Sequence, residues 1–313
     1  MLNRQSRRLM ALAGVSITAL ILSGCTSGSS SSSSGTIPKI SKDEALAALV
    51  PAAYSANGTI RVGTDASYAP NEYIDGEQIV GMDIDLGNAI GEVLGVTMKF
   101  TNSPFDAIIP GIQSGKYDLG MSSFTANAER QKVVNFATYF SAGTQWATRA
   151  GNPDAIAINN ACGKKIAVQK GTVQVDDLTA RSKKCTTAGK KAITINQYQL
   201  QSDATNAVAS GKDQAMLADS PITAYAVKTA PGLELLGDIY DSAPYGIALP
   251  CGSAGSKSCA TPLSAQPKAN ADFAKAVQGA IKKLIEGGQY KAILTKWGVD
   301  GGAVTSSTIN PAK

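Results

Sequence analysis

The sequence of 313 residues contains no histidine. This absence excludes Ser-His-Asp and Cys-His nucleophilic catalysis, because both need an imidazole as general base. It also excludes the usual zinc sites with histidine ligands. An enzymatic function is therefore disfavoured, and we expect neither a cofactor nor a metal ion.

The net charge of the chain is also small. The chain carries 29 basic and 24 acidic side chains, a formal net charge of +5. Three of the arginines, Arg4, Arg7 and Arg8, lie in a segment that we expect to be removed, and +5 less three charges leaves +2. This is not the electrostatic footprint of a nucleic-acid-binding protein.

The N-terminal apolar run from Leu9 to Leu22 is shorter than the ~20 residues that span a bilayer. It follows the three arginines and ends in "LSGC", with Cys25 last. This pattern resembles a bacterial lipoprotein signal, which implies cleavage before Cys25 and lipidation of its thiol. We expect a signal peptide at 1–24, and a lipidated cysteine with a flexible serine-rich tether at 25–41. The protein would then be extracytoplasmic and anchored to the cell membrane.

Cysteine is sparse, with five residues in all. If Cys25 carries the lipid, four remain, and three disulfide connectivities are possible. Proximity along the chain favours Cys162 with Cys185 and Cys251 with Cys259. An exported protein makes disulfides more plausible than buried free thiols.

The body alternates strand and helix patterns. "TIRVGTD" at 59–65 and "VTMKF" at 96–100 read as strands, and 82–95 reads as a helix that stops at Gly95. The helix places four apolar residues on one face, Leu86, Ile90, Val93 and Leu94. The alternation predicts βαβ units and a mostly parallel sheet, so the fold class is α/β.

Two segments, 108–123 and 204–220, follow the same plan. Each is a helix closed by Ser-Gly-Lys, with Gly115 or Gly211 just past the helix end, followed by a strand that ends in polar residues. Chance similarity between two generic βαβ units is the alternative. We favour two similar lobes whose polar strand ends face each other across a crevice, where open α/β sheets bind ligands.

The stretch "MSSFTANAER" at 121–130 crowds polar side chains after a short predicted strand. Arg130 is expected in the first turn of the next helix, where the helix dipole disfavours a cation. A bound anion would resolve this conflict.

These segments resemble the extracytoplasmic solute-binding proteins of polar amino acid ABC importers. The motifs are "VGTDASYAPNEY", "GMDIDLGNAIGEVLG", "IIPGIQSGKYDLGMSSFTANAERQKVVNFATYF", "VQKGTVQ" and "GGQYKAILTKWG", and the similarity runs from about Gly58 to Gly298. The resemblance implies the periplasmic-binding-protein-like type II fold, in which two βαβ lobes are joined by two crossing hinge strands. It places lobe 1 at 58–147 and 246–313 and lobe 2 at 148–245, with crossings near 146–151 and 242–246.

The family pattern also implies how the amino acid backbone is held. Arg130 would bind the ligand's α-carboxylate with help from Thr125, and Asp219 would accept its α-ammonium. Ser122 and Ser123 would add hydroxyl or carbonyl contacts, although simple strand termination explains either serine nearly as well. Asp219 could alternatively cap the helix that follows it.

Two further positions, Thr172 and Gln174, match residues that contact the ligand main chain near a helix N-terminus. Val173, between them, departs from the hydroxyl residue common there, so one contact is absent.

Three residues match positions that contact the ligand side chain. Asp65 matches an acid that contacts a distal polar group, while Tyr68 and Phe105 match aromatics that sandwich the ligand stem. Ordinary core packing is the alternative for the two aromatics, and a turn role is the alternative for Asp65. Asn71 replaces a common phenylalanine and changes the expected shape of the pocket.

The sequence therefore predicts a monomeric lipoprotein that captures a polar amino acid by cleft closure and delivers it to the membrane permease of an ABC importer. We expect a cationic ligand such as arginine, lysine or ornithine. Glutamine or another zwitterion is the alternative ligand. An exported dehydratase-like enzyme using Glu72, Asp65 or Asp219, or a sensor without transport, are alternative functions.

Overall fold

The computed structural model describes residues 37–55, 57–252, 258–259 and 262–311. The predicted signal peptide, Cys25 and most of the tether lie outside these residues. Within the described ranges, no helix combines the length and the apolar character that crossing a bilayer requires.

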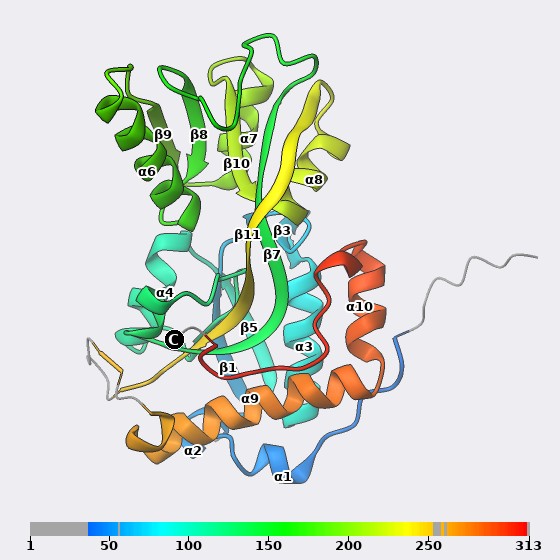
Figure 1. Cartoon of the computed structure of the whole chain (residues 1–313). Helices are drawn as coiled ribbons and strands as arrows, with labels where there is room; N and C mark the ends of the chain where they lie inside the picture. The colour runs from blue at the N-terminus through cyan, green and yellow to red at the C-terminus, as the bar shows by residue number, and fades with distance from the viewer. Residues whose placement is uncertain (1–36, 56, 253–257, 260–261, 312–313) are drawn as a thin grey trace, which may run out of the picture. The chain divides into compact units, whose positions relative to one another are not determined.

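One eight-stranded sheet carries the fold (Figure 1). Its strands, in spatial order, are β5 (Thr97–Asn102), β1 (Thr59–Thr64), β6 (Leu119–Gly120), β11 (Leu233–Leu249), β7 (Asn135–Arg149), β10 (Ala215–Asp219), β8 (Lys165–Gln169) and β9 (Thr194–Tyr198). β1 pairs in parallel with β5 and β6, and β8 pairs in parallel with β9 and β10. Only the long strands β7 and β11 pair antiparallel with their neighbours in this sheet. The predicted α/β class is confirmed.

The two long strands join the two ends of the sheet (Figure 1). β6 pairs with β11 near its end, at Ala248, while β10 pairs with β7 from Thr144 to Thr148. Between these contacts the β7–β11 ladder is irregular, with register shifts from Leu236 to Gly246. Lobe 1 is therefore attached to one end of the β7–β11 pair, and lobe 2 is attached to the other end.

The first predicted crossing, near 146–151, begins at Trp146. Trp146 is fully buried and packs with Ile166 and Leu217, which belong to the core of lobe 2. We therefore propose that the chain crosses between the lobes just before Trp146. The remaining lobe boundaries stay a proposal.

In both lobes, helices flank the sheet (Figure 1). They are α1 (Glu44–Ala47), α2 (Ala52–Ser55), α3 (Met82–Leu94), α4 (Phe105–Gln113), α5 (Ala128–Gln131), α6 (Val173–Thr187), α7 (Gln201–Ala209), α8 (Ser220–Thr229), α9 (Lys268–Glu286) and α10 (Gln289–Trp297), with 3-10 turns η1 (Leu263–Ala265) and η2 (Asp300–Gly302). The predicted apolar face of α3 is buried, and Gly95 ends the helix in the left-handed conformation with φ of 69°. Gly115 and Gly211 follow α4 and α7 with φ of 77° and 78°, which confirms the predicted common plan of the two segments.

A short antiparallel sheet lies beside the carboxyl end of β1. It contains β2 (Ser67–Tyr68), β3 (Glu72–Asp75) and β4 (Gln78–Val80). β3 carries Glu72 into the interior of lobe 1, whereas the tip of the β3–β4 hairpin is exposed.

Both predicted disulfides are present. Cys162 bonds to Cys185 across 23 residues, and Cys251 bonds to Cys259 across 8 residues. The first ties the loop before β8 to the end of α6. Cross-linking a loop of that size stabilises the fold by about 3 kcal/mol in the chain-entropy model.

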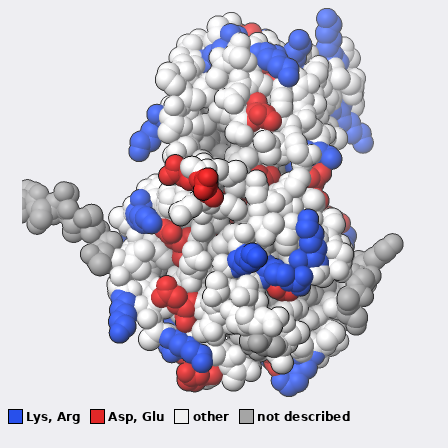
Figure 2. Space-filling view, turned by 180° about the vertical axis from the view of Figure 1, so that it is seen from behind, with Lys and Arg blue, Asp and Glu red and all other residues white. Residues whose placement is uncertain are grey.

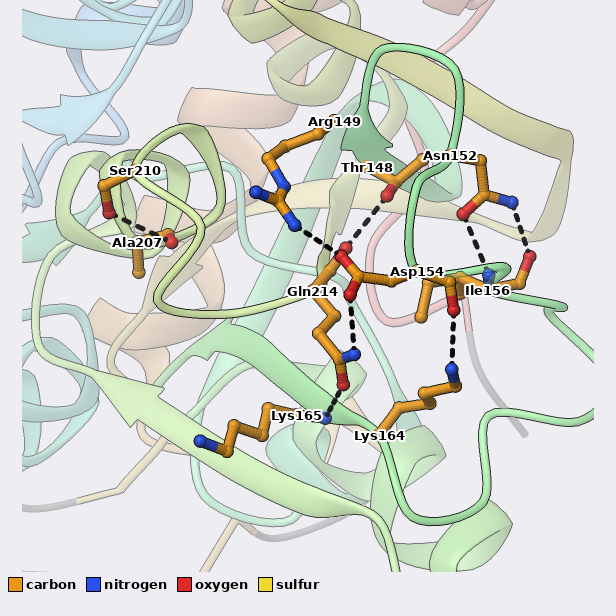
Figure 3. Close-up of polar contacts among 10 residues, drawn as sticks. All are labelled: Thr148, Arg149, Asn152, Asp154, Ile156, Lys164, Lys165, Ala207, Ser210 and Gln214. Atoms are coloured by element: carbon orange, nitrogen blue, oxygen red, sulfur yellow. Dashed lines mark hydrogen bonds and ion pairs between the residues drawn. The ribbon is translucent and has the colours of Figure 1, made fainter.

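A polar network fixes the far end of β7 in lobe 2 (Figure 3). Its centre is Asp154, whose carboxylate accepts hydrogen bonds from Arg149 at 2.7 Å and from the Gln214 amide at 2.9 Å. Gln214 in turn accepts from the backbone N–H of Lys165 at 2.9 Å. The network therefore connects the end of β7 to the residues at which β8 and β10 begin.

The surface charges are interspersed. On the face shown in Figure 2, lysines and arginines lie in separate groups with acidic side chains between them. This face carries no continuous stripe of one sign.

Candidate functional site

A small cavity between the lobes collects side chains from the carboxyl ends of four parallel strands, as open α/β sheets do. It is lined by Asp65, Tyr68, Phe105, Ser122, Ser123, Thr125 and Arg130 from lobe 1, and by Gln169, Thr172, Val173, Gln174 and Asp219 from lobe 2. All ten predicted ligand-contacting residues are in this set. The sequence interpretation missed Gln169 and assigned Val173 no contact.

The lobes touch directly across this cavity, whose volume is about 10 Å³, roughly the space for one ordered water. Tyr68 Oη donates to Asp219 Oδ2 at 2.9 Å, and Gln169 Nε2 donates to Asp65 Oδ2 at 2.8 Å. Both bonds join one lobe to the other. An amino acid can enter only if the lobes separate and these bonds break.

The rim of the cavity carries a second group of contacts between the lobes. Asp106, in the first turn of α4, pairs with Lys170 at 2.8 Å and accepts from the Gln199 amide at 2.9 Å. Ser67 Oγ accepts from the backbone N–H of Gln201 at 3.0 Å. These contacts close the rim around the buried site.

Arg130 is the cation of the site. Its Nη1 donates to the carbonyl of Thr125 at 3.0 Å and its Nη2 to the carbonyl of Gly171 at 3.1 Å. The guanidinium also lies over the rings of Phe105 and Phe124, with 5.2 Å and 5.6 Å to the centroids. No carboxylate within the described ranges forms an ion pair with it.

Burial lowers the pKa of Arg130 to about 10, and the charge of Asp219 partly offsets this effect. The side chain is still a cation at neutral pH. The expected helix dipole contributes little, because α5 is a single turn of four residues. Burial, rather than the dipole, is therefore the stronger reason to expect an anion beside Arg130.

Asp219 is the carboxylate that lobe 2 contributes to the site. Its Oδ2 accepts from Tyr245 Oη at 2.7 Å in addition to Tyr68, and its Oδ1 accepts from Gln174 Nε2 at 2.7 Å. Burial raises its pKa, and these hydrogen bonds oppose the rise. Asp219 occupies the N-cap position of α8, but its side chain makes no capping bond. The carboxylate is directed at the cavity instead, which disfavours the alternative of a helix cap.

Asp65 is fully hydrogen-bonded. Its Oδ1 accepts from the N–H and the hydroxyl of Ser67, and its Oδ2 accepts from Gln169 and from the N–H of Phe105 at 2.9 Å. The last bond satisfies a free N–H in the first turn of α4, whose N-cap residue Pro104 makes no side-chain cap. Burial raises the pKa of Asp65, while the bonds from Ser67, Phe105 and Gln169 lower it.

The amide oxygen of Gln169 is buried and has no hydrogen-bond donor within the described part of the chain. It belongs to a side chain that is 1% exposed and lines the same cavity as Asp65. A buried acceptor without a partner is costly, so this oxygen is a candidate acceptor for a ligand N–H.

The aromatic residues have both packing and lining roles. Phe105 stacks on Phe124 with 4.7 Å between ring centroids, and Tyr68 packs on Ala218 and Ile222 across the lobe boundary. Core packing and contact with a ligand are therefore compatible for both residues.

The remaining polar residues complete the walls. Thr172 precedes α6, and its hydroxyl donates to the carbonyl of Gln169 at 2.8 Å. Ser122 and Ser123 lie at the floor of the cavity, where Asn71 donates to Ser123 Oγ at 2.8 Å. Asn71 is completely buried and therefore supports the floor rather than shaping the open part of the pocket.

Known proteins are similar to this chain. The model of the bacterial extracellular solute-binding proteins, family 3, matches residues 60–300. Arginine-binding protein ArgT of Corynebacterium glutamicum is 32% identical over 309 residues, which are 97% of this chain and 96% of ArgT.

Solved structures agree with the fold. An ancestral arginine-binding protein, solved bound to arginine and bound to glutamine, has a TM-score of 0.66 in both forms, with 31% and 30% identity over 77% of this chain and 98% of that chain. The ancestral amino acid-binding protein AncCDT-1, a precursor of cyclohexadienyl dehydratase, has a TM-score of 0.65 and 31% identity over 77% of this chain and 96% of that chain.

Proposed function

The chain belongs to the bacterial extracellular solute-binding proteins, family 3, and we propose that its solute is a free amino acid with a cationic side chain. The lobes close on arginine, lysine or ornithine, and the closed form delivers the ligand to the permease of an ABC importer. The arginine-binding relatives support this choice of ligand class.

The observation that carries the proposal is the pair Arg130 and Asp219. They are opposite charges on opposite lobes, and both line one cavity. Within the described ranges, the guanidinium of Arg130 has only carbonyl oxygens as hydrogen-bond acceptors. An α-carboxylate on Arg130 would give the guanidinium an anion, and an α-ammonium on Asp219 would neutralise a buried carboxylate. A zwitterionic backbone satisfies both lobes at once only when the cleft is closed.

Two acceptors favour a cationic side chain. Asp65 and Gln169 lie on opposite lobes, and the amide nitrogen Nε2 of Gln169 already donates to Asp65 Oδ2. The amide oxygen of Gln169 has no donor within the described residues. A guanidinium or ammonium that displaces this bond would find a carboxylate and an amide oxygen together. Tyr68 and Phe105 would hold the ligand's alkyl stem. The walls would add polar contacts to the ligand main chain from Ser122, Ser123, Thr125, Thr172 and Gln174.

Glutamine is the second candidate ligand. The ancestral arginine-binding protein is also solved with glutamine, and Asp65 already has four neutral donors. A neutral amide side chain would leave that arrangement almost unchanged.

An enzymatic role is disfavoured. The catalytic alternative would require Glu72, Asp65 or Asp219 as acid or base. Asp219 fits an α-ammonium better, because a substrate without one would leave this carboxylate uncompensated in a closed cleft. The relatives named above as binding proteins support a receptor, and we propose that it acts as a monomer. A sensor that reports ligand to a membrane partner without transport is the alternative function.

Lipid attachment at Cys25 completes the proposal. The signal-like residues 1–24 support export and anchoring. A Cys25→Ala variant expressed in the native host should move from the membrane fraction to the soluble fraction. Retention of that variant in the membrane fraction would reject the anchor.

A thermal-shift screen of the mature chain against the proteinogenic amino acids, ornithine and citrulline tests the ligand class. A ligand at 100 times its dissociation constant adds about 2.7 kcal/mol to the free energy of unfolding. We expect the cationic amino acids to raise the melting temperature most. If no compound with an α-ammonium raises it, the role of Asp219 is wrong.

A further inference from the structure

Two carboxyl groups lie buried beneath the floor of the site, and the proposed ligand contacts use neither. They are Glu72 in β3 and Asp83 in α3, both 0% exposed. Their hydrogen bonds lead to Ser122 and Ser123, which line the cavity.

The two carboxylate oxygens of Asp83 differ in their hydrogen bonds. Its Oδ2 accepts from Tyr139 Oη at 2.7 Å and from the backbone N–H of Ser123 at 2.9 Å. Its Oδ1 is buried and has no donor within the described ranges. A buried carboxylate oxygen without a donor is expensive, so a proton donor is expected beside it.

Glu72 is the carboxyl group beside Asp83 that can supply that proton. Its Oε1 accepts from Ser122 Oγ at 2.9 Å, and its Oε2 lies 3.4 Å from Ser123 Oγ. Burial and the neighbouring Asp83 raise the pKa of Glu72 well above its usual value, and burial raises the pKa of Asp83 to about 6. Two carboxylates in one dry site cannot both ionise cheaply.

The surrounding acids act in both directions. Asp65 after β1 adds to the rise in the pKa of Glu72 through its charge, whereas the hydroxyl of Tyr139 in β7 lowers the pKa of Asp83 through its hydrogen bond. Tyr68 in β2 is a third acid, close enough for the charge of Glu72 to act on it. No lysine or arginine of the described segments forms an ion pair with Glu72 or Asp83.

We propose that Glu72 and Asp83 share one proton, which Glu72 donates to Oδ1 of Asp83, and that this pair positions Ser122 and Ser123 at the floor of the ligand site. Ser123 needs such support, because its φ of 51° is a left-handed conformation that costs energy for a residue other than glycine. Asp83 fixes its N–H, while Asn71 fixes its hydroxyl.

Loss of the shared proton would place two negative charges in contact. The pair would separate, and the serines that it holds would shift with it. Ligand affinity should therefore fall at alkaline pH because the carboxyl pair of the protein titrates, in addition to any titration of the ligand. This consequence rests on the proposed function, whereas the shared proton itself does not.

Infrared spectroscopy of the mature chain tests the proton directly. At about pH 7.5, wild type should show the carbonyl stretch of a protonated carboxylic acid, and Glu72→Gln should lose that intensity. Glu77→Gln, at an exposed position of the β3–β4 hairpin, is the matched control and should leave the band unchanged. Identical spectra for wild type and Glu72→Gln would overturn the proposal.

Asp83→Asn gives an independent reading if Glu72→Gln does not fold. Removing the neighbouring charge should move the titration of the Glu72 band to lower pH, because the like charge that raised its pKa is gone. A band that titrates at the same pH as in wild type would contradict the shared proton.

Calorimetry with L-arginine tests the positioning role. The ratio of the dissociation constants of wild type and Glu72→Gln cancels the titration of the ligand. We expect this ratio to rise about tenfold for each pH unit above the pKa of Glu72. A ratio that is constant with pH would mean a merely structural role. If arginine does not bind at all while the infrared result holds, the proposed ligand fails and the proton pair stands.

Discussion

The hydroxyl of Tyr68 in lobe 1 donates a 2.9 Å hydrogen bond to Asp219 Oδ2 in lobe 2, so the residue proposed to receive the ligand's ammonium is already bonded across the cleft. The lobes therefore touch through the same groups that the ligand would use. Ligand binding must replace these bonds rather than add to them.

Tyr68→Phe should open the ligand-free protein. A hydrogen bond to a charged group contributes about 1.5–3 kcal/mol, so its loss should shift the population toward open forms. Small-angle scattering should show a larger radius of gyration without ligand and a wild-type value with saturating arginine.

Tyr54→Phe is the control for this experiment, because Tyr54 packs on Phe273 far from the cleft. It should behave as wild type. If Tyr68→Phe also leaves the ligand-free radius unchanged, the bond to Asp219 does not hold the lobes together.

Arg130→Ala should abolish binding of every amino acid. Truncating one partner of a buried charge pair costs about 2–5 kcal/mol, which is at least a thirtyfold loss of affinity. Calorimetry measures this loss. Lys132→Ala, two residues away and exposed, is the control and should bind normally. A loss confined to one ligand would refute the carboxylate assignment.

Asp65→Asn should weaken the binding of arginine more than the binding of glutamine. The substitution keeps the shape of the side chain and removes the charge that would meet a guanidinium. We expect a difference of about tenfold between the two ligands, or 1.4 kcal/mol. Equal losses, together with a lower melting temperature, would mean that Asp65 only supports the start of α4.

Asp154→Asn should destabilise lobe 2 in a pH-dependent way. Hydrogen bonds from Gln214 and Arg149 lower the pKa of Asp154, so its ionised form is stabilised by folding. This contribution is present above the unfolded pKa of about 3.9 and is lost as pH falls through the folded pKa. Urea unfolding should show a deficit of about 1 kcal/mol at neutral pH.

The deficit of Asp154→Asn should shrink in acid, where the wild-type carboxyl is protonated too. Asp75→Asn, in the exposed β3–β4 hairpin, provides the control and should match wild type at both pH values. A deficit that is independent of pH would assign the effect to packing.

Local patterns predicted much of this structure. The apolar face of α3, its end at Gly95 and the glycines after α4 and α7 depend on residues close in sequence. The polar strand ends were also visible, since Ser122 and Ser123 follow the buried strand β6 and Asp219 is the last residue of the buried strand β10.

Long-range contacts explain what the sequence missed. Gln169 meets Asp65 across 104 positions, and Tyr245 reaches Asp219 only because β11 crosses between the lobes. Strand register decides such contacts, and no local pattern encodes it. The saturation of Asp65 by four donors was hidden for the same reason.

The most direct test of the central claim is calorimetric titration of the mature chain with L-arginine and with L-citrulline, which has nearly the same shape but a neutral side chain. We predict that arginine binds at least about tenfold more tightly than citrulline, a difference of 1.4 kcal/mol. Equal affinities, or tighter binding of citrulline, would contradict a receptor for cationic amino acids.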